Sequence, residues 1–245
     1  MKKKGATHIE IILSFILFAS AVGFALYFLN PVDHTRLVDS SLGYASREIL
    51  DNTSISVDSL SVLIKNTPPE RILSSAQGNI IAVNISGIPL SKNVRVEELD
   101  GTVLPSERSG EIVYIKNSAG WPAKEFVYIR FSEDFDSAVS VSPHPFDNST
   151  FYEISSSENI NAISEKKMLY LNTTYFENYQ DLKEKRFNLP NRVNFGFSLK
   201  FDDNKNIIAE KNIPNGLEVF SDNKRTDVLR KNGALDFGDF NIKIW

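Results

Sequence analysis

The spacing of apolar residues changes several times along this chain, and the first pattern is an unbroken apolar run. Ile11–Leu29 contains 19 residues without a charge. A helix needs about 20 mostly apolar residues to span a membrane, so we predict a transmembrane helix at residues 6–30 behind a basic leader at residues 1–5. Lys2–Lys4 favour a cytoplasmic N-terminus, which would place the rest of the chain outside the cell.

A second helical pattern follows Asn30-Pro31, where the proline ends or kinks the first helix. From Arg36 to Leu50 the apolar residues recur at spacings of three and four, and most charged residues fall on the other side. We therefore predict an amphipathic helical stem at residues 31–51, on which the first folded domain can pack.

From Ser54 onward the apolar residues recur with a period of two, which is typical of strands with one buried face. Asp100-Gly101 lies between two such runs and is a strong signal for a two-residue hairpin. Short strands with regular turns predict a β-sandwich-like domain at residues 52–142. Its expected strands are Ile55–Ile64, Asn79–Ile85, Asn93–Leu99, Thr102–Leu104, Ile112–Lys116, Phe126–Phe131 and Ala138–Val141.

Two prolines in three residues, Pro143 and Pro145, resist both helix and central strand. They predict a linker at residues 143–149 between the sandwich and a second domain.

Residues 150–245 predict a second β-rich domain of the α+β type, so the fold class as a whole is mainly β. It contains one expected helix near residues 175–187, which Thr174 can cap. Val193–Phe201 alternates strictly and predicts a half-buried strand. The other expected strands are Thr150–Ser155, Lys167–Asn172, Ile207–Lys211, Leu217–Phe220, Arg225–Leu229 and Leu235–Ile244. Asn232-Gly233 is expected to join the last two as a hairpin.

Composition excludes several classes of partner and site. After the apolar run the chain contains 24 Lys and Arg and 30 Asp and Glu, which gives a net charge of −6, and the sequence shows no basic patch. Nucleic acid is therefore not an expected partner. The chain has no cysteine, which excludes disulfides, thiolate metal sites and cysteine nucleophiles.

No catalytic or cofactor motif occurs in the chain. The three histidines, at positions 8, 34 and 144, fall on separate predicted segments and show no metal-ligand spacing. Asp202–Asn206 begins like a calcium loop, but Ile207 replaces its glycine and Ile213 its final glutamate, so a polar hairpin turn is expected. We expect no enzymatic activity, no cofactor and no metal.

Glu10 is the unusual residue of the N-terminal segment, because an ionised carboxylate is costly at the head of an apolar helix. If the chain were cut after Gly5, Ala6 would carry a new α-amino group and Glu10 would be the fifth mature residue. That amino group is a cation, and in an assembly it could pair with Glu10 of a neighbouring copy.

This arrangement resembles the class III signal of type IV prepilins: a basic leader, a glycine before the cut, glutamate at the fifth mature position and an apolar helix. The resemblance covers residues 2–29, and Lys4-Gly5-Ala6-Thr7-His8-Ile9-Glu10 is similar to small archaeal pilin-like membrane proteins. Ala6 departs from the phenylalanine common in bacterial pilins. The resemblance implies processing by a prepilin peptidase, contact with membrane lipid, and assembly with other pilin subunits or with itself through this helix.

Two other interpretations of the N-terminus remain open. It could be an uncleaved anchor with Glu10 at the membrane interface, or a secretory signal cut near Ala19-Ser20-Ala21. The function then divides between a structural pilin-like surface protein, as a minor or filament-associated subunit, and a non-assembling membrane-anchored binding or adhesion module. In either case we expect a single-pass protein of the cell membrane with an extracellular C-terminal domain.

The chain contains four sequons for N-linked glycosylation, where chance alone would give about three. Their acceptor residues are Asn52, Asn84, Asn148 and Asn172. The motif permits modification without requiring it.

Overall fold

The computed structural model of the chain is mainly β, with 85 residues in strands and 67 in helices, which confirms that the fold class is mainly β. It describes residues 4–28, 33–65, 79–121, 125–136, 139–142 and 150–245, without the side chains of 4–9, 27–28 and 33–38.

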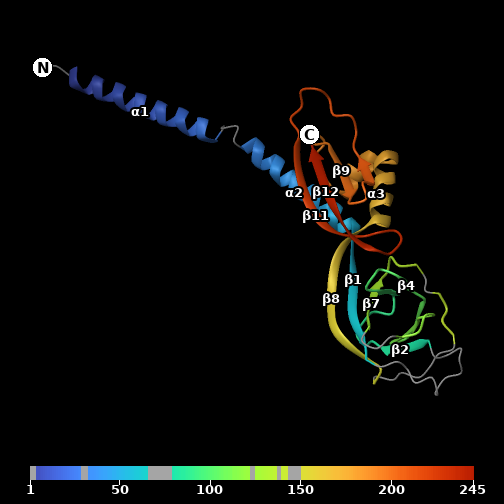
Figure 1. The fold of residues 1–245 in the computed structure, drawn as a ribbon. Coiled ribbons are helices and arrows are strands. Elements are labelled where there is room, and N and C mark those ends of the chain that lie inside the picture. Colours follow the sequence, from blue (N-terminus) through green and yellow to red (C-terminus); the bar gives the residue numbers. More distant parts are fainter. Residues whose placement is uncertain (1–3, 29–32, 66–78, 122–124, 137–138, 143–149) are drawn as a thin grey trace.

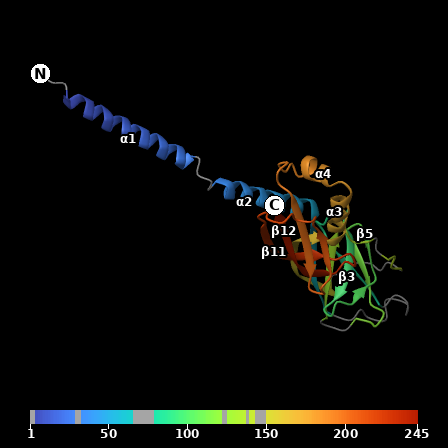
Figure 2. The ribbon, with the colours of Figure 1, turned by 90° about the horizontal axis from the view of Figure 1, so that it is seen from above.

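Two helices open the chain at the positions that the apolar pattern indicated. Helix α1 comprises Lys4–Phe28 and α2 comprises Asp33–Thr53. Figures 1 and 2 show α1 extending away from the rest of the molecule, whereas α2 lies against a sheet. Only α2 therefore belongs to the folded body.

The part of the chain farthest from α1 is a sandwich of two sheets, which we call the sandwich lobe. One layer is the β8-β1-β7-β3-β4 part of a nine-stranded sheet that continues into the other lobe, and the second layer is a three-stranded sheet of order β2-β6-β5. Apolar residues from both sheets form one buried core, with Val62, Val96 and Val113 fully covered. The bounds are β1 Ser54–Ile64, β2 Ile80–Asn84, β3 Asn93–Glu98, β4 Val103–Leu104, β5 Ser106–Ser109, β6 Ile112–Lys116, β7 Glu125–Ser132 and β8 Tyr152–Ser164.

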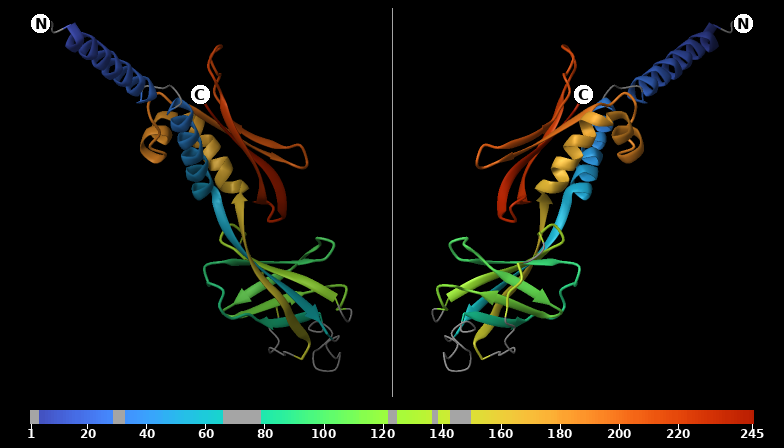
Figure 3. Two further views of the ribbon diagram at one scale, coloured as in Figure 1. Left: turned by 90° about the vertical axis from the view of Figure 1, so that its left-hand side faces the viewer. Right: turned by 90° about the vertical axis from the view of Figure 1, so that its right-hand side faces the viewer.

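The remaining strands form the helix-covered lobe. They continue the nine-stranded sheet in the order β10-β9-β12-β11, and helices pack on one face of this part of the sheet. Figure 3 shows α2 and α3 side by side on that face. The strict alternation predicted for Val193–Phe201 is confirmed, since Phe195, Phe197, Leu199 and Phe201 are buried. The bounds are α3 Glu165–Glu177, α4 Tyr179–Asp181, the π-helical turn η1 Leu182–Arg186, β9 Phe195–Phe201, β10 Asn206–Ala209, β11 Phe220–Leu229 and β12 Leu235–Ile244.

A pair of strands joins the two lobes. Helix α2 leads directly into β1, and β8 leads directly into α3, so that the helix pair of one lobe continues as the strand pair of the other. β1 and β8 pair antiparallel over their whole length, and β8 then pairs in parallel with β11 through Ile163 and Val228. The predicted linker at 143–149 lies outside the described residues, and strands from both sides of it share the sandwich sheet.

Polar contacts also connect the lobes near this strand pair. Arg95 Nη1 of the sandwich lobe donates to Asn232 O in the β11–β12 hairpin at 2.7 Å. Lys166 Nζ of α3 donates to Asp134 O of the sandwich lobe at 2.7 Å. The hairpin predicted at Asn232-Gly233 is thus confirmed, and its tip rests on the other lobe.

The prediction of a strand at Lys167–Asn172 is wrong, because these residues belong to α3. Ser164 caps the helix, and its side chain accepts a hydrogen bond from Lys167 N at 3.1 Å. Met168, Leu171 and Tyr175 are spaced by three and four residues and bury one face of the helix in the core. The helix therefore begins ten residues before the predicted start, and Thr174 lies inside it.

The strand expected at Ala138–Val141 is also wrong over its described residues, 139–141, which are irregular. Val141 is nevertheless buried, against β2 and β6. Its N–H donates to Glu107 Oε2 at 2.6 Å, so a side chain satisfies the backbone donor that a strand would have paired.

Candidate functional site

The residues to which the sequence assigned processing and assembly all lie on α1. Gly5 and Ala6 are in its first turns, and their side chains lie outside the described part. Glu10 follows four residues after Ala6, about 6 Å farther along the helix axis, and it is exposed. Gly5, Ala6 and Glu10 are thus at one end of a single continuous helix.

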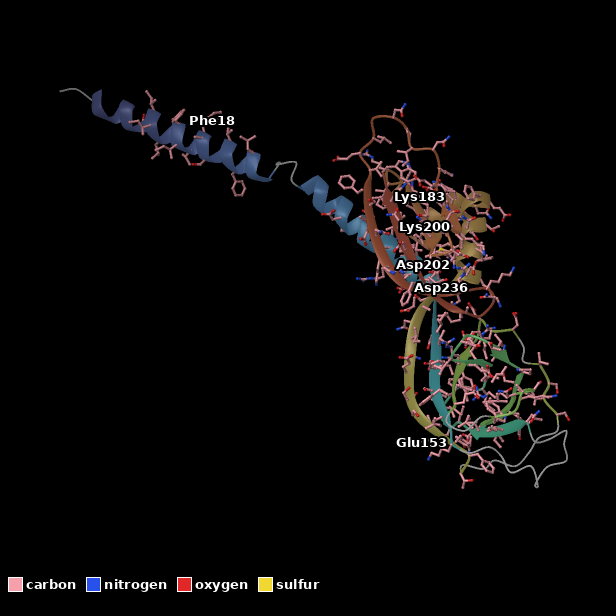
Figure 4. All side chains as sticks on the ribbon, in the orientation of Figure 1. Phe18, Glu153, Lys183, Lys200, Asp202 and Asp236 are labelled. Atoms are coloured by element: carbon pink, nitrogen blue, oxygen red, sulfur yellow. The ribbon has the colours of Figure 1, made fainter. Side chains whose placement is uncertain are left out.

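Beyond Glu10, α1 exposes apolar side chains on every side. Every residue from 10 to 26 is exposed, and the exposed fractions reach 64% at Ile11, 67% at Phe18 and 65% at Phe24. Figure 4 shows Phe18 and its neighbours pointing outward around the helix with no other part of the chain beside them. A helix that is apolar all round is normally buried in a large core or in a membrane.

Two further properties of the described chain bear on this helix and on metal binding. Among the described residues, no helix combines the length and the apolarity needed to cross a membrane. No group of three or more His, Asp or Glu side chains within the described ranges is arranged to hold a metal ion.

The calcium-like segment Asp202–Asn206 is the turn between β9 and β10, which confirms the interpretation as a polar hairpin turn. Its carboxylates are paired with cations: Asp202 with Arg225 at 2.9 Å, and Asp203 with Lys205 at 3.1 Å. Hydrogen bonds from the Lys205 side chain and backbone lower the pKa of Asp203 to about 2. Asn204 occupies the left-handed region with φ of 63°, as a tight turn requires.

The asparagines of the sequons differ in whether their side-chain amides already form hydrogen bonds. Asn52 Nδ2 donates to Glu48 O at 2.7 Å, and its Oδ1 accepts from Arg186. Asn172 Nδ2 donates to Ile208 O at 2.7 Å. Asn84 is exposed at the end of β2, and Asn148 lies outside the described residues.

A small cavity lies where α2, α3 and η1 meet, and sequence reasoning missed it. Its volume is about 360 Å³. Its walls are Asn52, Lys166, Lys167, Tyr170, Leu171 and Arg186. These residues come from three separate stretches of the chain, one of which was predicted to be a strand. No local pattern could have brought them together.

Comparison with protein-family models, with curated proteins and with solved structures finds no match to this chain.

Proposed function

We propose that the protein is a pilin-like structural protein of the cell surface, cleaved after Gly5 and held in the membrane by α1. The observation that carries the proposal is the all-round apolar surface of α1. Large apolar side chains that stay in water lose about 1.5–3 kcal/mol each relative to burial. Ten such residues on one helix need an apolar environment that the rest of this chain does not supply. Lipid and the same helix of other copies are the environments that the resemblance implies.

Glu10 gives the assembly its specificity in this proposal. The carboxylate lies at the start of the apolar run, where the α-amino group of Ala6 would be created by cleavage. Pairing the amino group of one copy with Glu10 of the next removes both charges from an apolar surrounding together. A charge left alone there would be expensive, which restricts assembly to registers that make the pair.

A second function, a non-assembling binding module on a membrane anchor, is favoured by a different observation. Both lobes have buried cores of their own, to which the described side chains of α1 contribute nothing. The body therefore has no structural need of other copies. In this alternative α1 anchors a single molecule.

Replacing Glu10 with Gln separates the two functions. In an assembled protein the substitution leaves an α-amino cation without its counter-charge, at a cost of about 3–5 kcal/mol, which lowers association by a factor of hundreds or more. Cleavage depends on Gly5 and should continue. The measurement is the size of the membrane-extracted protein by crosslinking and size-exclusion chromatography.

Asp39→Asn is the matched control, because it removes one exposed carboxylate from α2 and leaves α1 unchanged. It should assemble like the wild type. A Glu10→Gln protein that assembles normally would refute the pairing, and a wild-type protein that is monomeric in the membrane would favour the binding module.

A further inference from the structure

The cavity between α2 and α3 is positively charged in a chain whose net charge is −4. Three of its six lining residues are cations, Lys166, Lys167 and Arg186, and none is a carboxylate. It lies at the end of the helix pair, where α2 passes into β1 and β8 passes into α3 (Figure 3). Its position on the body places it away from the apolar surface of α1.

Two of these cations have only neutral partners among the described residues. Lys167 Nζ donates to Ser54 O at 2.9 Å. Arg186 donates through Nε and Nη2 to Asn52 Oδ1 at 3.0 and 2.6 Å. Lys166 does have a carboxylate partner, but Asp136 is 88% exposed and stands outside the cavity. Lys167 and Arg186 therefore have no carboxylate partner among the described residues, whereas Lys166 is paired at the rim.

The other walls are apolar and aromatic. Leu171, which lines the cavity, is buried, and Tyr170, which also lines it, is 66% exposed. An exposed aromatic ring beside uncompensated cations provides a flat apolar surface next to an anion-binding group. An arginine has five donors in a planar fork, and the two that meet Asn52 leave others for a ligand carboxylate.

We propose that this cavity binds an anionic saccharide, meaning a sugar ring that carries a carboxylate. The carboxylate meets Arg186 and Lys167, and the apolar side of the ring lies on Tyr170. The cavity's volume is in the range of small-ligand pockets, larger than a single inorganic anion needs. The inference does not depend on whether α1 assembles.

The test is calorimetric titration of the full chain in a polyoxyethylene detergent, which contains no sugar. The titrants are an oligomer of glucuronic acid, a neutral glucose oligomer of equal length, and inorganic phosphate. We expect the acidic oligomer to bind with a dissociation constant of about 0.1–1 mM, weakening as salt is added. The neutral oligomer should give no heat of binding, and phosphate should compete only at much higher concentration.

Arg186→Gln should lower the affinity for the acidic oligomer about tenfold, because it removes a charge-assisted, forked donor. Tyr170→Ala should also lower it. The matched control is Lys185→Gln, the same loss of charge one residue away, where Lys185 pairs with Asp181 and does not line the cavity. This variant should bind within about twofold of the wild type.

Three outcomes would overturn the proposal: no binding of the acidic oligomer, equal binding of the neutral one, or an equal loss in Lys185→Gln and Arg186→Gln. Phosphate binding as tightly as the acidic oligomer would reduce the cavity to a simple anion site and would contradict the role of Tyr170. Tyr170 is exposed, so Tyr170→Ala should melt like the wild type, and its loss of binding reports on the cavity and not on folding. Arg186 also bonds to Asn52, so the melting temperature of Arg186→Gln is measured beside that of Lys185→Gln.

Discussion

Helices α1 and α2 follow each other in the chain and are similar in length, with 25 and 21 residues, yet they relate to the rest of the molecule in opposite ways. In α2, Ala45 and Ile49 are completely buried in the core of the helix-covered lobe, and Asp39, Tyr44 and Arg47 face solvent. In α1, every side chain that the structure describes is exposed, whatever its direction around the axis.

The difference comes from how apolar residues are distributed around each helix. An apolar stripe on one side can be covered by one sheet, and α2 finds that sheet within its own chain. An apolar surface on all sides cannot be covered from one direction, so a sheet of this size could not bury α1. We therefore expect α1 to need surroundings that its own body does not supply, and we expect the body, whose cores contain no described side chain of α1, to fold without it.

Matched substitutions in the two helices should give the largest difference in stability. Ile49→Asp places a charge in a fully buried site and should cost about 4 kcal/mol or more, enough to unfold the body. Phe18→Asp should leave the free energy of unfolding of the body unchanged, since Phe18 contacts no core. Denaturant unfolding followed by circular dichroism measures both variants, and equal losses of stability would show that α1 is part of the body.

A smaller effect is expected within the core on which α2 and α3 pack. The Tyr175 hydroxyl donates to Phe195 O at 2.7 Å, and burial raises the pKa of Tyr175. Tyr175→Phe leaves that buried carbonyl without its donor and should cost about 1–3 kcal/mol. Tyr170→Phe removes an exposed hydroxyl and should change the melting temperature by very little. If both variants melt like the wild type, the buried hydrogen bond adds nothing to stability.

The smallest effect concerns the exposed turn of the same lobe. The pKa of Asp203 falls from 3.8 to about 2 in the folded state, chiefly through the side chain of Lys205. A lowered folded-state pKa stabilises the protein above pH 3.8, and this contribution is lost as the pH falls toward 2. Asp203→Asn should therefore flatten the fall of the melting temperature across that interval, while leaving cleavage and assembly through α1 unchanged. An identical pH profile in the variant would contradict the pairing.

Local patterns predict most of the strands and both N-terminal helices, because the period of the apolar residues and the residue types in turns depend only on residues close together in the chain. The hairpins at Asp100-Gly101 and Asn232-Gly233 are of this kind. The start of α3 differs from the prediction, because the spacing of Met168, Leu171 and Tyr175 identifies a buried helical face only against the sheet that it covers. The distinction depends on the sheet beneath the helix, whose strands β9 to β12 lie within residues 195–244.

The long-range pairing of β8 with β1 and the cavity beside α3 could not be predicted from any local pattern. The pairing joins Ser54 to Ile163, more than 100 residues apart. The cavity depends on the contact of Arg186 with the end of α2, where its side chain donates a hydrogen bond to Asn52. Such contacts depend on topology, and sequence periodicity carries no information about which strands become neighbours.

The most direct test of the central claim is the mass of the mature protein extracted from membranes. If α1 is the cleaved assembly helix of a pilin-like protein, removal of five residues leaves a chain of 240 that begins at Ala6 and keeps the apolar helix. A Gly5→Leu variant should keep its leader, which provides the matched comparison on the same instrument. A wild-type chain that starts at Met1 or Lys2, or one that starts at Val22 after loss of most of α1, would contradict the claim.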